Sequence, residues 1–312
     1  MSLVQTTTAL GSLWRKSTGS HILAQLSDYW TLTKPEVNFL ILITTFLGFY
    51  LGCGSQARPL CLAGVFNTLL GTLLVASGTG TLNQYIERNF DAQMRRTARR
   101  PAATGRLSPA AVLAFGIVLA VAGSLYLATT INLLTCVLAV LTLLTYLFLY
   151  TPLKRVTPLC VLVGAFSGAM PPLIGWAAAT GQLKAEVGIL YCIVFLWQFP
   201  HFMAIAWMYR EDYDRAGYLV LPKGKSRVSF VILQTLLPLT ALVAVSIMQA
   251  PARHAAIFYW TVALLDGGFL YSGVAFATLR SRGAARRLLT ASIVYLPVLF
   301  GLSVTLCNRV TR

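Results

Sequence analysis

Residues 83–101 read NQYIERNFDAQMRRTARRP and directly follow an apolar run from residue 60 to residue 82. Within them, Asn83, Glu87 and Asp91 are spaced four residues apart, and we call these three residues the acidic ladder. If a helix continues through the segment, the three side chains drift only about 80° around its axis and share one face. The whole chain has nine Asp and Glu residues, and two of them fall here. We therefore expect a binding site on this helix face.

Arginines accompany the ladder. Arg88 lies within it, and Arg95, Arg96, Arg99 and Arg100 follow it. Carboxylate and amide oxygens are preferred ligands of Mg2+, whereas guanidinium groups form paired hydrogen bonds with phosphate oxygens. The combination predicts a site for a diphosphate carried by Mg2+. The alternative is a polar helix end at a membrane interface, where basic residues are expected in any case.

The composition is that of a membrane protein. Of 312 residues, 57% are hydrophobic and 11% are charged, and the mean hydropathy is +0.71. Soluble domains carry roughly 25% charged residues. Apolar runs of about twenty residues recur, each long enough to cross a hydrocarbon core of about 30 Å. We expect nine spans, at 37–52, 60–82, 109–128, 131–150, 158–178, 186–208, 228–250, 255–279 and 288–307.

The expected fold is therefore an all-α membrane protein, a bundle of nine transmembrane helices. Residues 1–30 form an N-terminal cytoplasmic or interfacial segment, and residues 31–312 form a single transmembrane domain.

The net charge of +16 follows the expected topology rather than a nucleic-acid surface. Of the 25 Lys and Arg residues, 20 fall in the N-terminal segment and the even-numbered loops, and five fall elsewhere: Arg58, Lys184, Arg253, Arg309 and Arg312. The positive-inside rule then places the N-terminus and the even loops in the cytoplasm (or an organelle matrix) and the C-terminus outside. Residues 1–30 contain no secretory signal core, so the first span would serve for targeting. We expect a bacterial inner membrane in preference to a mitochondrial one.

A second acidic segment ends the sixth span. Residues 197–217 read WQFPHFMAIAWMYREDYDRAG and contain Glu211, Asp212 and Asp214. Five of the nine acids thus lie in two segments that the charge pattern places on the same side of the membrane. This pairing predicts the other half of a metal–diphosphate site. The alternative is a solvated charged turn.

Prolines and isolated polar residues give further expectations. Pro171-Pro172 should kink or break the fifth span, and Pro200 should break the helix of the sixth. His201 lies roughly two helical turns inside the membrane and is either a hydrogen-bonded structural residue or a substrate contact. Asp266 in the eighth span is either a capped polar residue or a cavity-lining one. Lys34 is either a snorkelling anchor or a diphosphate contact.

The two acidic segments resemble the two aspartate-rich motifs of the UbiA-type intramembrane prenyltransferases. The first reads Asn83-x3-Glu87-x3-Asp91 followed by Met94-x-Arg96-Thr97-x2-Arg100-Pro101. Glu87 stands where Asp is common in that superfamily. The second segment has Tyr209 and Tyr213 where the superfamily shows a DxxxD pair, so the acid that would touch metal stays open among Glu211, Asp212 and Asp214.

Further motifs are similar to one branch of the family, the protohaem IX farnesyltransferases (haem O synthases). They are Thr33-Lys34-Pro35, Tyr150-Thr151 with Leu153-Lys154-Arg155, Gly168-Ala-Met-Pro171-Pro172-Leu-Ile-Gly175-Trp176, Trp197-Gln198-x-Pro200-His201-Phe202 and Trp207-x-Tyr209-Arg210-Glu211-Asp212-Tyr213-x3-Gly217. The motifs occur in order, and the resemblance runs from about Leu32 to the ninth span.

The resemblance implies a nine-helix bundle around a central cavity, open laterally to lipid and capped by cytoplasmic loops. It implies transfer of a farnesyl group from farnesyl diphosphate to a vinyl group of haem B, with Mg2+ as cofactor. The implied catalytic residues are Asn83, Glu87, Asp91, Asp212 and His201. The implied metal ligands are Asn83, Glu87 and Asp91, with Glu211, Asp212 or Asp214 opposite. The implied diphosphate contacts are Lys34, Arg88, Arg96, Arg100, Lys154, Arg155 and Arg210. The implied haem and prenyl contacts are Trp197, His201, Phe202 and Tyr209.

Expected partners are the lipid bilayer, the two substrates and a haem A synthase or terminal oxidase assembly, with no nucleic acid. Two other functions are compatible with parts of the pattern. A related UbiA-type enzyme acting on another aromatic or chlorin acceptor would share the acidic motifs. A secondary transporter would use the acids as a cation site, but transporters place such charges near the bilayer midplane. Here the acids are expected at one membrane face.

Overall fold

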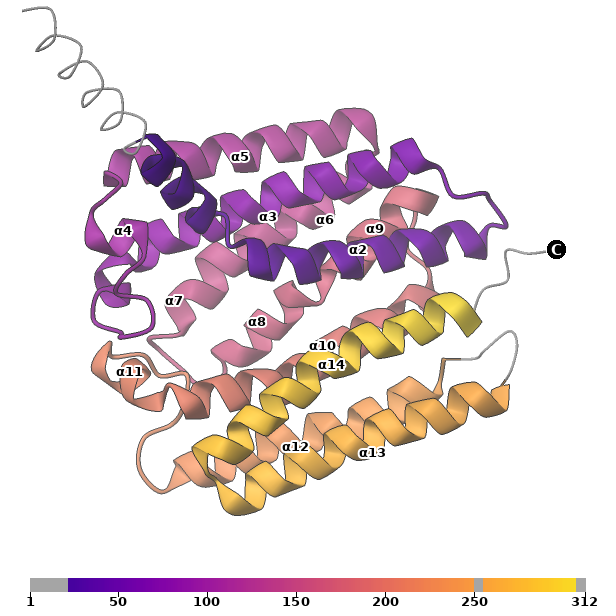
Figure 1. Ribbon diagram of the computed structural model, residues 1–312. Coiled ribbons are helices and arrows are strands. Elements are labelled where there is room, and N and C mark those ends of the chain that lie inside the picture. Colours follow the sequence, from indigo (N-terminus) through magenta and orange to yellow (C-terminus); the bar gives the residue numbers. More distant parts are fainter. Residues whose placement is uncertain (1–21, 250–254, 307–312) are drawn as a thin grey trace, which may run out of the picture.

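The computed structural model describes residues 22–249 and 255–306, and the regular structure in these ranges is helical (Figure 1). As predicted, nine helical stretches within these ranges are long and apolar enough to cross a membrane. They are α2 (Pro35–Ser55), α3 (Leu62–Asp91), α5 (Pro109–Thr130), α6 (Leu133–Leu144) continued by η1 (Thr145–Tyr150) and α7 (Thr151–Leu153), α8 (Cys160–Gly168) with α9 (Met170–Thr180), α10 (Ala185–Met208), α12 (Ser226–Ile247), α13 (Ala255–Leu279) and α14 (Arg282–Leu306). A helical segment at 22–32 precedes them, and α4 (Pro101–Thr104) and α11 (Arg210–Arg215) are short.

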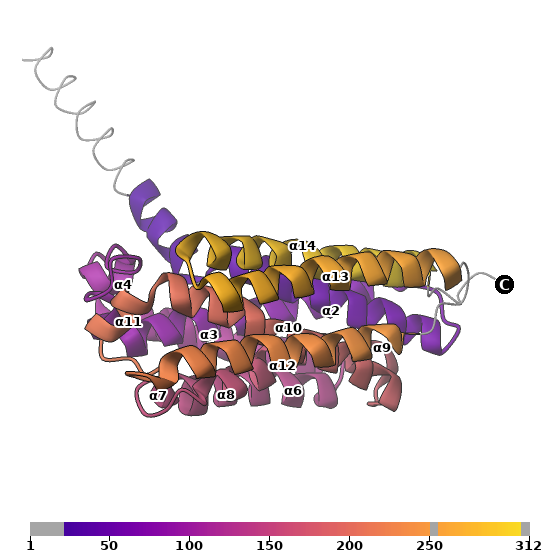
Figure 2. The ribbon, with the colours of Figure 1, turned by 90° about the horizontal axis from the view of Figure 1, so that it is seen from below.

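The long helices lie side by side, and the even-numbered connections share one end of the bundle. Figures 1 and 2 show α4, α7 and α11 together at this end, with the last turns of α14 at the other. The second span does not stop at residue 82 but continues as α3 to Asp91. The acidic ladder is therefore helical, as its spacing predicts, and it lies at the end where α4 and α11 gather.

Two helix pairs contact each other backbone to backbone. On α2 a Cβ at Gly48 would collide with the carbonyl oxygen of Pro172 on α9, and on α9 a Cβ at Gly175 would collide with a backbone oxygen of α2. Between α3 and α5, a Cβ at Gly78 would lie 2.6 Å from the backbone nitrogen of Ala120. Small residues allow this approach, and close packing is a main source of attraction between helices surrounded by lipid.

The prolines behave differently from one another. The fifth span is broken at Ala169, and Pro171 and Pro172 fall in the first turn of α9, where a missing N–H costs little. This expectation is confirmed. The expectation for Pro200 is wrong, because α10 runs through it from Ala185 to Met208. One missing N–H removes a single backbone hydrogen bond, and Pro200 is buried where neighbouring helices hold α10 in line.

Asp266 is a capped polar residue and not a cavity-lining one. Its side chain is buried on α13, and its two oxygens accept hydrogen bonds from Ser246 Oγ of α12 at 2.6 Å and Tyr295 Oη of α14 at 2.7 Å. Unpartnered polar groups are expensive in apolar surroundings, so these bonds tie the three C-terminal helices together.

The backbone contact of α2 with α9 predicts that Gly175→Ala will destabilise the protein. Overpacking of this kind costs about 1–3 kcal/mol, and the neighbouring carbonyl has no rotamer into which it can move. Thermal unfolding of the detergent-solubilised protein measures the effect. Gly267→Ala on α13 is the matched control, because no atom lies within 4 Å of its added Cβ. Equal unfolding temperatures for the two variants would contradict the interpretation.

Candidate active site

The acidic ladder is buried at the end of α3. Asn83 is 1% exposed, Glu87 6% and Asp91 1%. The Asn83 Nδ2 group donates a hydrogen bond to Glu87 Oε2 at 3.0 Å, which joins the first two residues directly. The face predicted from the spacing therefore exists and points into the protein. Because buried carboxylates are costly unless they are paired, their partners define the site.

Three segments bring donors to Asn83 and Glu87. Lys34 Nζ, in the turn before α2, donates to Asn83 Oδ1 at 2.7 Å. Lys154 Nζ, in the turn after α7, donates to Glu87 Oε1 at 2.7 Å, and Tyr218 Oη, after α11, donates to the same oxygen at 2.9 Å. The two ladder residues thus join parts of the chain that are far apart in sequence.

These contacts change the acid–base properties of the donors. Burial lowers the pKa of Lys34 to about 7, and the nearby Arg100 cation adds to the effect. Burial also disfavours the Lys154 ammonium, but the Glu87 carboxylate outweighs burial and raises the pKa of Lys154 well above its usual range. Burial, followed by the Glu87 charge, raises the pKa of Tyr218, so its hydroxyl remains a donor. Lys154 and Tyr218 are therefore firm donors to Glu87, whereas Lys34 holds its proton more weakly.

Asp91 has one carboxylate oxygen with a partner and one without. Oδ2 accepts a hydrogen bond from Arg100 Nη1 at 2.8 Å, and the backbone oxygen accepts one from Thr97 Oγ1 at 3.0 Å. Oδ1 is enclosed and has no partner among the described residues. Such an orphaned buried oxygen is costly, and a bound cation would satisfy it.

The donor set fits Mg2+, which prefers carboxylate and amide oxygens. The fit is closest at Asp91, because Asn83 Oδ1 and both Glu87 oxygens already accept bonds from protein donors. Within residues 22–249 and 255–306, no three His, Cys, Asp or Glu side chains lie close enough together to hold a metal by themselves. A metal would therefore share the ladder with ligand oxygens or require a change of partners.

Asp212 is the acid of the second segment that meets the first. It is 7% exposed, and its Oδ2 accepts a hydrogen bond from the backbone N–H of Arg96 at 3.3 Å. Its Oδ1 pairs with Arg215 at 3.3 Å, and Arg215 also donates to the carbonyl of Gln93 at 3.3 Å. Asp212 thus ties α11 to the loop that follows the ladder.

The other two acids of this segment are directed elsewhere. The Glu211 side chain is 78% exposed and lies 3.9 Å from Arg210. Asp214 accepts two hydrogen bonds from Arg227, at 2.9 and 3.1 Å.

The predicted diphosphate contacts divide into two groups. Lys34, Lys154 and Arg100 reach the ladder, so Lys34 is an internal contact rather than a snorkelling anchor. Arg88 turns away, because its guanidinium donates to the carbonyl of Tyr85 at 2.7 Å and lies 4.6 Å from that ring centre.

The remaining three basic residues lie over aromatic rings. Arg155 is 4.3 Å from the ring centre of Phe90, Arg96 is 5.0 Å from that of Tyr209, and Arg210 is 5.1 Å from an indole of α10. Arg96 therefore covers one face of Tyr209, a residue predicted to be a haem or prenyl contact.

Three predicted acceptor contacts form one cluster between α10 and α14. The His201 ring stacks on Trp197, with centroids 4.7 Å apart and planes inclined by 27°, and meets the edge of Phe202 at 5.9 Å. His201 Nδ1 lies 2.8 Å from Ser292 Oγ of α14. Trp197 Nε1 donates to the backbone oxygen of Ser292 at 2.8 Å.

Sequence reasoning missed Tyr218 and Ser292, and it named Thr151 only as part of a family motif and not as a site residue. Thr151 accepts a hydrogen bond from Asn83 Nδ2 at 3.2 Å, and it directly follows the π-helical turn η1, which has no sequence signal of its own. Tyr218 follows Gly217, whose φ of 71° marks a turn that the glycine could have indicated. Ser292 carries no signal, because serines recur along the helices as internally bonded residues.

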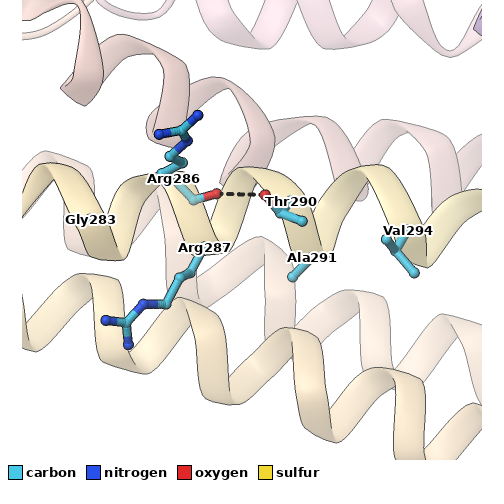
Figure 3. A pocket seen from close by; sticks show the side chains of 6 residues that line it. All are labelled: Gly283, Arg286, Arg287, Thr290, Ala291 and Val294. Carbon is cyan, nitrogen blue, oxygen red and sulfur yellow. Dashed lines mark hydrogen bonds between the residues drawn. The ribbon is translucent and has the colours of Figure 1, made fainter.

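A surface recess of about 630 Å³ is lined by residues of α14. Figure 3 shows its lining on α14, with the side chains of Arg286, Arg287 and Val294 and the bond from Thr290 Oγ1 to the carbonyl of Arg286. It contains none of the predicted site residues.

Comparisons with known proteins relate the chain to a prenyltransferase family. The model of the UbiA prenyltransferase family matches residues 41–300. The chain is 45% identical to a protoheme IX farnesyltransferase of Solibacter usitatus (strain Ellin6076), over 89% of this chain and 97% of that protein. It is 40% identical to that of Koribacter versatilis (strain Ellin345), over 89% and 93%.

Two solved structures share the fold. A digeranylgeranylglyceryl phosphate synthase superposes with a TM-score of 0.71 at 16% identity, over 92% of this chain and 99% of that one. A UbiA homologue from Archaeoglobus fulgidus bound to GPP and Mg2+ superposes with a TM-score of 0.56 at 13% identity, over 89% and 99%. The family model and the relatives together cover most of the chain, and the chain belongs to the UbiA prenyltransferase family.

Proposed function

We propose that this chain transfers the farnesyl group of farnesyl diphosphate to a vinyl group of haem B (protohaem IX), giving haem O and diphosphate. The observation that carries the proposal is the buried acidic ladder met by Lys34, Lys154 and Arg100 at one end of an apolar bundle. The acceptor follows from the relatives, which are named protoheme IX farnesyltransferase.

Binding of the diphosphate would begin with an exchange of partners. Its oxygens offer Lys34, Lys154 and Arg100 an alternative to the ladder oxygens. Each cation then offsets part of the negative charge that grows on the diphosphate as the allylic C–O bond breaks. Moving the same cations from the ladder oxygens to phosphate also exposes the oxygens of Asn83, Glu87 and Asp91.

We expect the ladder residues Asn83, Glu87 and Asp91, together with Asp212 from the second segment, to hold Mg2+ through their side-chain oxygens. When bound, Mg2+ supplies charge neutralisation to the diphosphate. The unpartnered Asp91 Oδ1 supports this role, as do the two Archaeoglobus fulgidus homologues bound to a prenyl diphosphate and Mg2+. Glu211 and Asp214 are weaker candidates, since both side chains are directed away from the ladder.

The C–O bond of farnesyl diphosphate breaks, the electron pair leaves with the diphosphate, and the farnesyl carbon becomes an allylic cation. The π electrons of the vinyl group form the new C–C bond. Water adds to the resulting cation and loses a proton, which leaves a hydroxyethylfarnesyl group. The apolar interior limits premature capture of the first cation by water.

Aromatic faces are candidates to stabilise that cation. Trp197 and Phe202 lie beside His201, and their π systems attract positive charge. Arg96 occupies one face of Tyr209, and that face would become available if Arg96 moved, for instance to bind phosphate.

We place the site at the cytoplasmic face of a bacterial inner membrane, with the C-terminus outside, from the 20-to-5 distribution of basic residues. A haem A synthase or terminal oxidase assembly stays a predicted partner.

The first prediction concerns Asp91. With haem B, farnesyl diphosphate and Mg2+, the purified protein should increase the mass of haem by farnesyl plus water, as read by mass spectrometry. Asp91→Asn should lower turnover by roughly 100-fold or more, because it removes a carboxylate that we expect to hold the Mg2+ that neutralises the leaving group. Omitting Mg2+ should have the same effect.

Glu36→Gln is the matched control, since Glu36 is an exposed acid in the first turn of α2. Unchanged haem together with prenylation of an aromatic or chlorin acceptor would assign the chain to another UbiA-type activity. Full activity of Asp91→Asn would remove the ladder from the reaction.

The second prediction separates the three acids of the second segment. Asp212→Asn should lower kcat/KM by roughly 100-fold and raise the Mg2+ concentration needed, because it is the buried acid that meets the first motif. Glu211→Gln and Asp214→Asn should stay within about threefold of the parent protein, as expected for exposed charges. A larger loss in either of these two than in Asp212→Asn would contradict the assignment.

A further inference from the structure

Arg106, in the turn between α4 and α5, joins the helical segment 22–32 to the loop that follows the ladder (residues 92–100). Its guanidinium pairs with the Asp28 carboxylate through three donor–acceptor contacts of 2.9 to 3.1 Å. It also donates from Nη2 to the backbone oxygen of Arg99 at 3.2 Å. The Asp28 side chain is 15% exposed, and bidentate pairs of this kind are stronger than ordinary surface ion pairs. Arg106 thus fixes one point of the loop backbone.

The fixed point lies next to a residue of the site. Arg99 directly precedes Arg100, and the Arg100 guanidinium donates to Asp91 Oδ2 at 2.8 Å. The backbone of Arg100 is held as well, because its carbonyl oxygen accepts hydrogen bonds from two backbone N–H groups of α4, both at 3.0 Å. Polar contacts therefore run from the helical segment 22–32 to the ladder without interruption.

The helical segment 22–32 is itself anchored to the bundle. Gln84 Nε2 of α3 donates to the backbone oxygens of Thr31 and Leu32, at 3.3 and 3.0 Å. The Leu32 side chain is fully buried in a small apolar cluster with residues of α4, of α5 and of the turn between them: Ala102, Leu107 and Val112. Figure 1 shows the segment, in indigo, near the starts of α2 and α5. Asp28 therefore projects from a support that is attached to α3, the helix that carries the ladder.

A loop that becomes ordered only when its ligand binds lowers the affinity, whereas a loop that is already ordered does not. We infer that Asp28 and Arg106 are positioning residues of the diphosphate site, which hold the loop so that Arg100 faces the ladder before the substrate arrives. Neither residue needs to touch the substrate for this role. The inference rests on the proposed function, because that function supplies the diphosphate.

The arrangement suits the exchange of partners proposed above. When the diphosphate binds, the Arg100 guanidinium has to move from Asp91 to a phosphate oxygen. The contact of Arg106 with the carbonyl of Arg99 involves only the backbone of the loop, so it can persist during this move. The side chain of Arg100 then changes its partner while its backbone keeps its place, which limits the conformational entropy that is lost on binding.

The experiment compares Asp28→Asn, Arg106→Gln and Arg227→Gln in the full-length purified protein. Arg227 is the matched control, because it also pairs with a carboxylate and donates to a backbone oxygen, but neither contact leads to the ladder. Its partners are Asp214 Oδ1 at 2.9 Å and the carbonyl of Pro222 at 2.9 Å. Calorimetry measures the binding of farnesyl thiolodiphosphate with Mg2+, since the C–S bond of this analogue resists ionisation. Farnesyl transfer and thermal unfolding are measured in parallel.

Asp28→Asn and Arg106→Gln should each bind the analogue roughly 10-fold more weakly than the parent, because the loop must then become ordered on binding. The KM for farnesyl diphosphate should rise by a similar factor, while kcat changes by less than about threefold. Asp28→Glu, which keeps the carboxylate, should recover most of the affinity, and Arg227→Gln should match the parent. In protein that already carries Arg100→Gln, Asp28→Asn should cause no further loss of affinity, since it acts through Arg100.

Three results would overturn the inference. If Asp28→Asn and Arg106→Gln bind the analogue as tightly as Arg227→Gln does, the pair has no positioning role, and the proposed function stands. If Asp28→Asn lowers the affinity as much in the presence of Arg100→Gln as in its absence, the pair acts on the fold and not through Arg100. If the parent neither binds the analogue nor converts haem B, the proposed function fails, and the inference fails with it.

Discussion

The ion pair between Lys154 and Glu87 is the contact on which the rest of the site depends. Glu87 is almost fully enclosed, and a carboxylate in such a place is tolerated only when it is paired and hydrogen-bonded. Tyr218, from the turn after α11, and Asn83, one turn earlier on α3, complete its bonds. The need to neutralise one buried charge therefore draws the turns after α7 and α11 towards the end of α3. The same donors are the groups that a diphosphate would need.

The sequence was most informative where a rare residue type met a strict spacing. With nine acids in 312 residues, the ladder at intervals of four could be placed on one helix face, and the structure confirms it. The nine spans were equally accessible, because length and apolar composition suffice to identify them. The double proline at Pro171 was also read correctly, since two missing donors in succession are hard to accommodate inside a helix.

The sequence was least informative about partners. Arg88 and Arg155 lie in segments that reach the ladder, but Arg88 bonds a backbone oxygen and Arg155 lies over an aromatic ring. The direction in which each side chain points depends on tertiary packing and not on sequence spacing. Pro200 remains inside a helix for the same reason, since packing supports the helix there. The contacts of Tyr218 and Thr151 with the ladder could not be predicted, because each residue reaches the ladder through a local turn. Spacing indicates that a site exists, and tertiary contacts decide which of its cations face the acids.

The contact between α2 and α9 limits how the sequence can change. Most close packing between helices can be repaired by a second substitution, because a larger side chain on one helix can be matched by a smaller one on its neighbour. At Gly48 and Gly175 the opposing atoms are backbone oxygens, which a side-chain substitution cannot remove or make smaller. No compensating pair of side chains exists for either position. A redesigned sequence for this bundle must keep both glycines or separate helices α2 and α9.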